Sequence, residues 1–419
     1  MKSTLLKNVF LDGKNVDILV SGDRIAKIGH SGLSDVPGDT EVVECSGKAV
    51  LPGLVNMHTH AGMAMMRGLG EDISFHKWLD RIWEVEKDIT EEYVYHATRV
   101  ACLEMIKTGT TTFNDQYWFM PEAYKAAVEL GIRPVLSYVF LDRNDPDEAE
   151  RQKVQCRQMY EVARQWGSEA MFMISIHAVY SVREEMMTWA TDFARRNGLK
   201  IHIHISETKK EVEDCFALHG MSPVEYLDKL GVLGPDVIAA HSLWLSDSDV
   251  EILGKRGVTC VHNVNSNLKL ASGYKFRYNE LRDAGANVCL GTDGCASSNN
   301  LDMLETMKTS AMIQKAWRED PSAMPLNELV EMATSNAGKA LGLDIGRIEE
   351  GMLADLILVD TRSYHFLSPG SFEANLIYSA HSDSIDSVMC GGRFLMRGRV
   401  VEGEEEILAA ARKVMNAEK

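Results

Sequence analysis

The chain has 419 residues, 45% hydrophobic and 25% charged, a composition typical of a folded globular protein. Its net charge of -17 and pI near 5.3 argue against nucleic acid or an anionic membrane as a partner, because the summed field repels phosphates. Eight cysteines without a C-x-x-C pair, no signal-peptide pattern and no run near the ~20 apolar residues of a span predict a cytoplasmic protein with reduced thiols.

Both ends of the chain are rich in short strand-like runs. In the first fifty residues, D-G, S-G-D and S-G turn signals separate apolar or alternating runs, which predicts a small antiparallel β unit. The same texture returns after residue 353, so we predict one small β-sandwich domain assembled from residues 1–52 and 350–419. The expected strands lie in 7–13, 15–23, 24–30, 40–47, 354–360 and 384–401, and a helix is expected in 404–419.

The middle of the chain, residues 53–349, alternates apolar runs with amphipathic segments, which is typical of βα units and a parallel sheet. Eight runs are the number that closes a (β/α)8 barrel, so the predicted class is α/β with a TIM barrel. The runs are 48–60, 110–116, 133–140, 171–179, 199–206, 236–245, 259–267 and 287–294.

Two helices are predicted early in the barrel. The first places Phe75, Trp78, Leu79, Ile82 and Trp83 on one face. Its tryptophans could stack on a ligand, but this spacing favours core packing. The next helix is expected to begin at Thr90, with acidic residues near its positive end, and to end at Gly109.

Polar residues interrupt the apolar runs mainly near their C-terminal ends, which line the active-site face of a barrel. His58 and His60 are two apart on the first strand and therefore point to the same side. An HxH pair alone is weak evidence for a metal, but the other strand ends add to it. They supply His177, His204, His241, His262, Asn263 and Asp293.

Neutral imidazoles with one carboxylate and an open position describe a catalytic zinc or iron site. The fourth run, 171–179, contains no lysine that could bridge two metals, so one metal is the economical interpretation. Glu207 follows His204 by three residues and is placed to move protons beside the metal. His202, one layer deeper, is expected to pack in the barrel or to support a ligand.

With these residues assembled, the sequence resembles the methylthioadenosine/S-adenosylhomocysteine deaminases of the amidohydrolase superfamily. Several separated motifs carry the resemblance in order along nearly the whole chain. They are "LPGLVNMHTH", "WLDRIWEVEKDIT", "ISIHAVYS", "IHIHISET", "IAAHSLWL", "HNVNSNLKLASG" and "LGTDGCASSNNLD".

The resemblance implies a distorted barrel with a terminal β-sandwich, and one divalent metal, with Zn2+ favoured over Fe2+. It implies that Glu207 and Asp293 move protons and that His241 hydrogen-bonds the attacking hydroxide or the developing oxyanion. Substrate binding falls to Glu86, which would hold the ribose hydroxyls, and to His177 and Glu207. The implied metal ligands are His58, His60, His204 and Asp293.

The sequence departs from the family pattern at two positions. Val264 stands where a proline is frequent, which affects a loop. Tyr138 ends the third strand where some relatives carry an arginine that could meet a substrate carboxylate. Arg143 and Arg151 are the nearby candidates for that role, and Arg151 is predicted to bind substrate. This departure disfavours S-adenosylhomocysteine relative to methylthioadenosine, adenosine or 5′-deoxyadenosine.

The leading hypothesis is therefore hydrolytic deamination of an adenine nucleoside to the hypoxanthine nucleoside and ammonia. An alternative within the superfamily is hydrolysis of another ring substituent, on guanine, cytosine, an oxidised purine or a chloro-triazine, for which a ribose-binding Glu86 has no use. A metal-free scaffold that serves in assembly is the third hypothesis, since a fold alone does not secure activity. The expected partner is a small-molecule nucleoside, and a homo-oligomer is compatible with the sequence.

Overall fold

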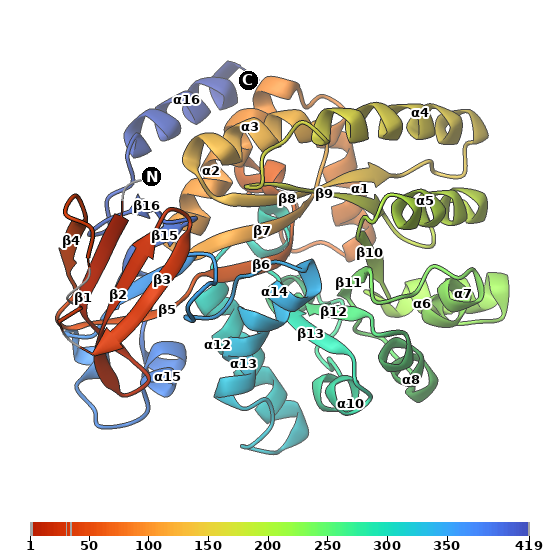
Figure 1. Ribbon diagram of the computed structural model, residues 1–419. Coiled ribbons are helices and arrows are strands. Elements are labelled where there is room, and N and C mark those ends of the chain that lie inside the picture. The colour runs from red at the N-terminus through yellow and green to blue at the C-terminus, as the bar shows by residue number, and fades with distance from the viewer. Residues whose placement is uncertain (1–2, 31, 34–35, 418–419) are drawn as a thin grey trace.

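The computed structural model describes residues 3–30, 32–33 and 36–417. Both ends of the chain contribute to one eight-stranded sheet, called the terminal sheet below (Figure 1). Its strand order is β16-β15-β14-β5-β1-β2-β3, with β4 beside β1. The strands are β1 (Ser3–Leu11), β2 (Lys14–Ser21), β3 (Arg24–His30), β4 (Glu41–Glu44), β5 (Lys48–Pro52), β14 (Leu356–Asp360), β15 (Ile385–Cys390) and β16 (Arg393–Met396).

The terminal sheet is mixed, so the expectation of a purely antiparallel unit was wrong. β1 pairs with β2 in antiparallel fashion but with β4 and β5 in parallel. β4 therefore runs in the same direction as β3. A core of its own backs the sheet, including the fully buried Leu6, Ile18 and Leu356.

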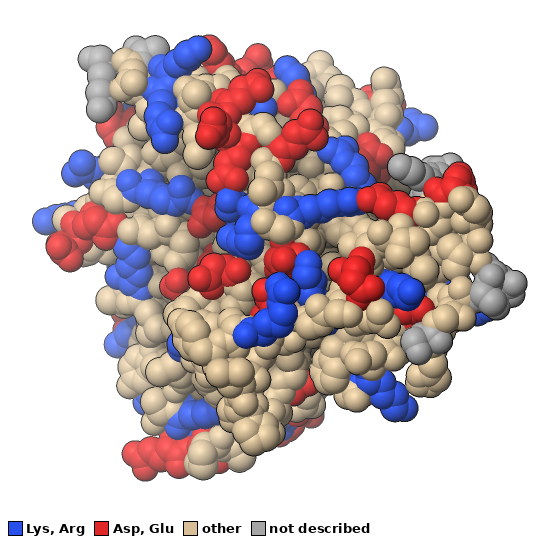
Figure 2. Space-filling model, turned by 90° about the vertical axis from the view of Figure 1, so that its left-hand side faces the viewer, with Lys and Arg blue, Asp and Glu red and all other residues tan. Residues whose placement is uncertain are grey.

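The outer face of this region carries both signs of charge. Figure 2 shows lysine and arginine side chains interspersed with aspartate and glutamate on this side of the molecule. Arg397 pairs with Glu41, and Arg24 with Asp344 at 3.0 Å. These exposed pairs contribute little stability each, and the mixture leaves no field of a single sign on this face.

The middle of the chain forms a second sheet of eight parallel strands that is nearly closed into a barrel. The strands follow sequence order around the barrel. The last returns beside the first, where the backbone N–H of Asp293 donates to the carbonyl oxygen of His58 at 2.9 Å. The barrel strands are β6 (Leu54–Thr59), β7 (Thr110–Gln116), β8 (Arg133–Phe140), β9 (Met171–Ile176), β10 (Ile201–Ile205), β11 (Val237–His241), β12 (Thr259–His262) and β13 (Asn287–Leu290).

The barrel strands are buried on both faces, as a parallel sheet covered by helices requires. A hydrophobic core lies between the barrel strands and the surrounding helices, and Phe113, Phe140 and Ile203 are fully buried in it. The helices are α1 (Phe75–Glu86), α2 (Glu91–Lys107), α3 (Met120–Leu130), α4 (Pro146–Ala163), α5 (Glu184–Arg196), α6 (Lys209–His219), α7 (Pro223–Lys229), α8 (Asp247–Arg256), α9 (Val264–Lys269), α10 (Tyr278–Asp283), α11 (Cys295–Ser298), α12 (Met303–Arg318), α13 (Leu326–Met332) and α14 (Ser335–Leu341).

The single strand expected over 48–60 is two strands in the structure, divided at Gly53. β5 belongs to the terminal sheet and β6 to the barrel. A Cβ atom on Gly53 would lie 2.2 Å from the Oγ1 of Thr111, so only glycine fits where the chain passes between the two sheets. One residue therefore separates the terminal sheet from the strand that carries His58.

The helix α2 begins with Thr90 as N-cap, whose side chain accepts from the N–H of Tyr93, and Gly109 follows it with φ +90°, as the sequence predicted. The C-terminal helix α16 (Glu404–Ala417) packs against α2, where Lys107 pairs with Glu404 at 2.7 Å. The last two residues of the predicted helix lie outside the described residues. Short helical turns complete the chain: η1 (Ala61–Met65), η2 (Tyr364–Phe366), α15 (Phe372–Ala374), η3 (Asn375–Ser379) and η4 (Ser382–Ser384).

Within the described ranges, none of the helices combines the length and the apolar character needed to cross a bilayer.

Candidate metal centre and active-site cavity

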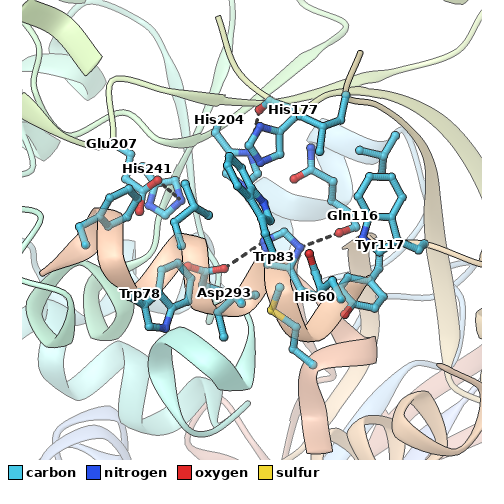
Figure 3. Close-up of a pocket in the computed structure, with 18 of the residues that line it drawn as sticks. His60, Trp78, Trp83, Gln116, Tyr117, His177, His204, Glu207, His241 and Asp293 are labelled. Atoms are coloured by element: carbon cyan, nitrogen blue, oxygen red, sulfur yellow. Dashed lines mark hydrogen bonds and ion pairs between the residues drawn. The ribbon is translucent and has the colours of Figure 1, made fainter. Parts of the chain in front are cut away.

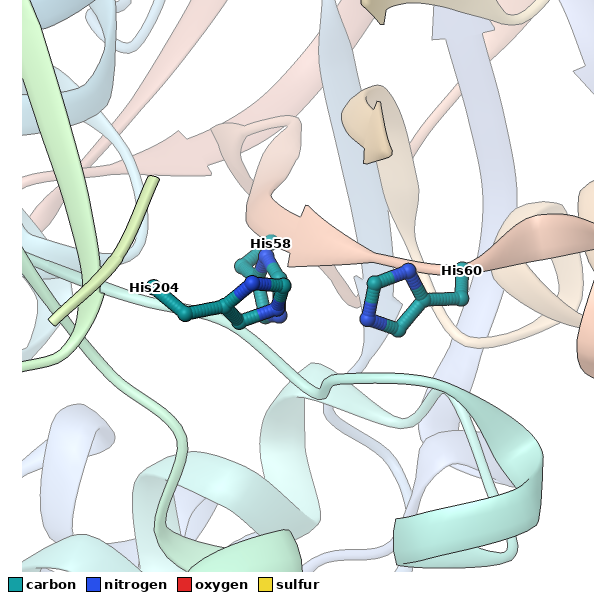
Figure 4. A group of neighbouring side chains, drawn as sticks. All are labelled: His58, His60 and His204. Carbon is teal, nitrogen blue, oxygen red and sulfur yellow. The ribbon is translucent and has the colours of Figure 1, made fainter. Parts of the chain in front are cut away.

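Four barrel strands bring imidazole and carboxylate groups to one point at their C-terminal ends. His58 lies near the end of β6 and His60 just beyond it, while His204 comes from β10. Figure 4 shows the three rings with nitrogen atoms turned toward a common space. His241 is the last residue of β11, and Asp293 follows β13.

The donor atoms are close enough to share one ion. One ring nitrogen from each of His58, His60 and His204 lies within 4.8 Å of the others, and the same holds for donor atoms of His58, His241 and Asp293. Oδ1 of Asp293 lies 3.4 Å from Nε2 of His58. It lies 3.2 Å from Nε2 of His60, as Figure 3 shows. The structure thus brings together the four residues that the resemblance implied as ligands.

The other ring nitrogens are held by groups outside this cluster. Nδ1 of His60 lies 2.6 Å from the carbonyl oxygen of Gln116, and Nδ1 of His204 lies 2.8 Å from that of His177. A carbonyl oxygen only accepts, so Nδ1 of each ring donates and Nε2 keeps its lone pair free. Such outer contacts set ring orientation and tautomer at metal sites.

A divalent metal fits these residues. Nε2 of His58 is completely buried, and among the described residues it makes no hydrogen bond of good geometry; its polar neighbour is Oδ1 of Asp293 at 3.4 Å. Such burial is costly unless the atom has another ligand. Burial lowers the pKa of His58 to about 4, so its ring is neutral and able to ligate. Although burial opposes it, hydrogen bonding and attraction to Asp293 raise the pKa of His60 to about 9, so this ring must lose its proton to bind a cation. In their neutral forms, the three imidazoles with one carboxylate suit zinc or ferrous iron.

Two cluster residues adopt left-handed backbone conformations. His241 has φ +68° and Asp293 φ +64°, and such conformations in residues other than glycine cost about 1–3 kcal/mol each. The backbone N–H of His241 donates to Oδ1 of Asn263 at 3.1 Å, and Oδ2 of Asp293 accepts from the hydroxyl of Ser266 at 2.6 Å. These bonds hold both residues where the strands turn into loops.

Two carboxyl groups of the site have opposite protonation preferences. Burial opposes ionisation of Asp293, but hydrogen bonding and attraction to His58 and His60 hold its pKa well below the usual range. Burial, with the charge of Asp293 nearby, raises the pKa of Glu207 to about 8. Oε2 of Glu207 lies 3.8 Å from Nε2 of His241. At neutral pH the site therefore holds one carboxylate and one carboxylic acid.

An aromatic-lined cavity opens above the cluster (Figure 3). The face of α1 forms one wall with Trp78 and Trp83. Trp78 is buried and also packs against α2, whereas Trp83 is only partly buried. The preference for core packing was therefore wrong for Trp83, because a cavity wall and a core demand the same apolar helix face.

Glu86 and His177 line the same cavity. Burial raises the pKa of Glu86, and Nδ1 of His177 lies 2.7 Å from the hydroxyl of Ser181. Glu86 sits at the C-terminal end of α1, at the junction with a second cavity of about 880 Å3 that shares Glu86, Tyr117 and Trp118 with the first. The wall that α1 contributes to the cavity therefore includes Trp78, Trp83 and, at the end of the helix, the carboxyl group of Glu86.

The two candidate arginines lie differently. Arg143 lines the second cavity, and its guanidinium lies 4.8 Å from the ring centroid of Trp83. Arg151 points away on α4, where it is exposed and pairs with Glu148, and it is not among the lining residues of either cavity. Tyr138 lines the second cavity and donates its hydroxyl hydrogen to Gln155 at 3.0 Å. The structure does not bring Arg151 to the site.

Several supporting residues were missed from the sequence. Asn267 and Ser266, which contact His241 and Asp293, stand in the motif "HNVNSN", so that motif could have indicated them. Gln116 contributes a backbone carbonyl, for which side-chain type gives no signal. Glu211, described below, had only its four-residue spacing from Glu207 to single it out.

Comparison with known proteins agrees with this geometry. Residues 49–395 match the Amidohydrolase family. The chain is 43% identical to a 5′-deoxyadenosine deaminase of Methanoregula boonei over 98% of this chain and 94% of the relative. It is 39% identical to a 5-methylthioadenosine/S-adenosylhomocysteine deaminase of Thermococcus sibiricus over 94% of both chains. A zinc-bound adenosine deaminase from Xanthomonas campestris superposes with a TM-score of 0.92 at 29% identity, covering 99% of this chain and 98% of the other.

Proposed function

The chain belongs to the amidohydrolase family, and from this premise we propose that it hydrolyses the C6–amino bond of an adenine nucleoside, releasing ammonia and the hypoxanthine nucleoside. The observation that carries the proposal is the pair Asp293 and Glu207. At neutral pH Asp293 is ionised and Glu207 is protonated, and both carboxyl groups face the cavity that Glu86 and His177 line. The names of the relatives support the adenine nucleoside.

We propose that His58, His60, His204 and Asp293 hold one divalent ion, with Zn2+ favoured over Fe2+. When bound, such an ion supplies Lewis-acid activation of water at neutral pH. The buried Nε2 of His58, which makes no hydrogen bond of good geometry among the described residues, supports this assignment. Elemental analysis of protein purified without chelator tests it: about one zinc per chain is expected, and protein that deaminates without any metal would reject it.

The two carboxyl groups account for the protons of the reaction. Asp293 accepts a proton from water while the water oxygen attacks C6. Glu207 donates its own proton to the ring nitrogen beside C6, so no full negative charge builds on the ring. Glu207 then removes the proton of the new hydroxyl group, forming the C6 carbonyl. Asp293 passes its proton to the amino group, which leaves as ammonia. Both carboxyl groups end in their starting states.

His241 holds the attacking oxygen in place. Its Nδ1 lies 2.9 Å from Oδ1 of Asn267, and burial lowers its pKa, so the ring is neutral. With Nδ1–H donated to Asn267, Nε2 offers a lone pair to the hydroxyl hydrogen of the water and of the adduct. His241 thus acts in the proposal as an acceptor, which fits the contact to the attacking hydroxide that the resemblance implied and not the alternative contact to the developing oxyanion.

Ammonia release from a panel of compounds tests the proposal. Adenosine, methylthioadenosine, 5′-deoxyadenosine and S-adenosylhomocysteine are compared with guanine and cytosine. Turnover of nucleosides is expected, because Glu86 is available to accept hydrogen bonds from the ribose hydroxyls. Activity confined to the free bases would reject the nucleoside assignment and favour hydrolysis of another ring substituent.

A further inference from the structure

The buried side chain of Glu207 has few polar contacts. Within the part of the chain that the structure describes, its single ion-pair contact is the one to His241 at 3.8 Å. Its position therefore depends on the backbone of residues 206 and 207, directly after β10. That backbone is strained, because Ser206 has φ +53°, a conformation that residues other than glycine and asparagine rarely adopt.

A second buried glutamate holds this strained backbone. Glu211 lies in the first turn of α6 with 6% of its surface exposed. One carboxylate oxygen accepts from the N–H of Ser206 at 2.9 Å, and the other accepts from the N–H of Glu207 at 2.8 Å. Both carboxylate oxygens of Glu211 thus accept hydrogen bonds from the two peptide groups that orient the Glu207 side chain.

The opposite side of the same turn is tied to β11. The carbonyl oxygen of Ser206 accepts from the N–H groups of Leu243 at 3.2 Å and Trp244 at 2.9 Å. Glu211 on one side and the loop after His241 on the other therefore clamp the peptide of residue 206. Because His241 ends β11, this arrangement places Glu207 relative to His241.

This use of a glutamate is unlike ordinary helix capping. Glu211 is the third residue of α6, whose N-cap is Thr208. At the same position of α7, Glu225 accepts from the N–H of its own N-cap Ser222 at 3.0 Å, which stabilises that helix, and its other oxygen accepts from the hydroxyl of Ser248 in α8 at 3.4 Å. Glu211 instead reaches past its N-cap to the two preceding residues.

We propose that Glu211 is a positioning residue for the deamination: by accepting from the N–H groups of residues 206 and 207, it aims the carboxyl group of Glu207 at the reacting ring nitrogen. This inference rests on the proposed function. Glu211 acts through Glu207 and the backbone, and no direct contact with the substrate is assigned to it.

Glu211→Gln tests the proposal, with Glu225→Gln as the matched control. In Glu211→Gln one acceptor oxygen becomes an NH2 group that faces a backbone N–H. We expect kcat with 5′-deoxyadenosine to fall about 10- to 100-fold while KM and metal content stay within about twofold, since misplacement of a catalytic group acts on the chemical step. Glu225→Gln should shift Tm to a similar extent and leave kcat within about twofold.

A transition-state analogue separates positioning from general destabilisation. The analogue is a nucleoside whose C6 is tetrahedral and bears a hydroxyl group. Its affinity for Glu211→Gln should fall, relative to wild type, by the same factor as kcat/KM, because both quantities report contacts made by Glu207 in the transition state. Unchanged kcat in a folded Glu211→Gln, or an equal loss in Glu225→Gln, would overturn the proposal.

A shortened side chain covers the case in which Glu211→Gln does not fold. Glu211→Asp keeps both acceptor oxygens but withdraws them by one methylene group, so an intermediate loss of kcat is expected, and full wild-type turnover would refute the positioning role. Inactivity of the wild-type chain on every nucleoside tested would instead refute the proposed function, and the two failures are therefore distinguishable.

Discussion

Nε2 of His202 lies 2.9 Å from Nδ1 of His58, and both rings are completely buried. A hydrogen bond between two neutral imidazoles needs one donor and one acceptor. Donation from Nδ1 of His58 leaves its Nε2 lone pair directed at Asp293, where the candidate metal ligands meet. His202 is thus the supporting residue that the sequence suggested, one layer below the site.

Replacing His202 by phenylalanine should weaken metal binding about 10- to 100-fold, the effect typical of losing a ligand's hydrogen-bond partner. Zinc affinity measured by competition with a chromophoric chelator checks this. His262→Phe is the matched control, because His262 is equally buried at the end of β12 but stacks on Phe276 and lines neither cavity. Equal losses in the two variants would contradict the assigned role of His202.

Glu207→Gln and His204→Ala should fail in different ways. Glu207→Gln is expected to keep its metal and to lose about 10²- to 10⁴-fold in kcat, since it cannot protonate the ring. His204→Ala should lose both metal and turnover. Metal analysis beside steady-state kinetics on the same preparations separates them, and a fully active Glu207→Gln would exclude Glu207 as the proton donor.

The pH dependence follows from the raised pKa of Glu207. Its acid form is the active one, and burial keeps the proton on until pH rises through about 8. A bound cation lowers this pKa, so kcat/KM should decline at a pH no higher than about 8. A pH–rate profile on metal-loaded enzyme measures this, with Tm followed over the same range as the control. A profile that stays flat well above pH 8 would contradict the assignment.

Glu86→Gln should raise KM for 5′-deoxyadenosine about 10- to 100-fold, because hydrogen bonds from ribose hydroxyls to a carboxylate are worth about 1.5–3 kcal/mol. A 2′,3′-dideoxy analogue should show no such change, since it lacks the hydroxyl groups. Glu84→Gln, an exposed glutamate of the same helix paired with Lys87, is the control. Equal effects on both substrates would argue against ribose binding.

Arg133 and Asp355 form a buried ion pair between the barrel and the terminal sheet, with Nε–Oδ2 and Nη2–Oδ1 distances of 3.2 Å. Arg133→Met should lower the free energy of unfolding by about 3–5 kcal/mol, because it leaves Asp355 buried without its partner. Arg24→Met at the same junction breaks the exposed pair with Asp344 and should cost less than about 1 kcal/mol. Urea unfolding measures both.

The barrel and the ligand cluster could be predicted from the sequence because their signals are local. Apolar runs mark strands, and a histidine or aspartate at a strand end marks the active-site face. The predicted domain boundary lies at 52/53, but the run 48–60 was taken as one barrel strand. The structure divides it at Gly53 into β5 of the terminal sheet and β6 of the barrel, where contact with Thr111 leaves no room for a side chain. The role of Trp83 escaped prediction because periodicity shows that a helix face is covered, without showing by what.

The supporting contacts are harder to predict for a different reason. The bonds from Glu211 to residues 206 and 207 depend on a left-handed turn at Ser206, which its residue type does not announce. Arg151 was a candidate because of its charge and its nearness in the chain to Tyr138, yet on the helix α4 its side chain is exposed and pairs with Glu148. Side-chain direction within a helix decides such cases, and it needs the exact helical phase relative to the barrel.

At Gly53 a single residue connects β5 of the terminal sheet to β6 of the barrel. Pro52 ends a strand that pairs with β14, and Leu54 begins one that pairs with β7, so one residue joins the terminal sheet to the first barrel strand. A tilt of the terminal sheet relative to the barrel would displace β6 and with it His58, which is only five residues from Gly53. The terminal sheet, remote from the chemistry, therefore holds the N-terminal end of the strand that carries His58.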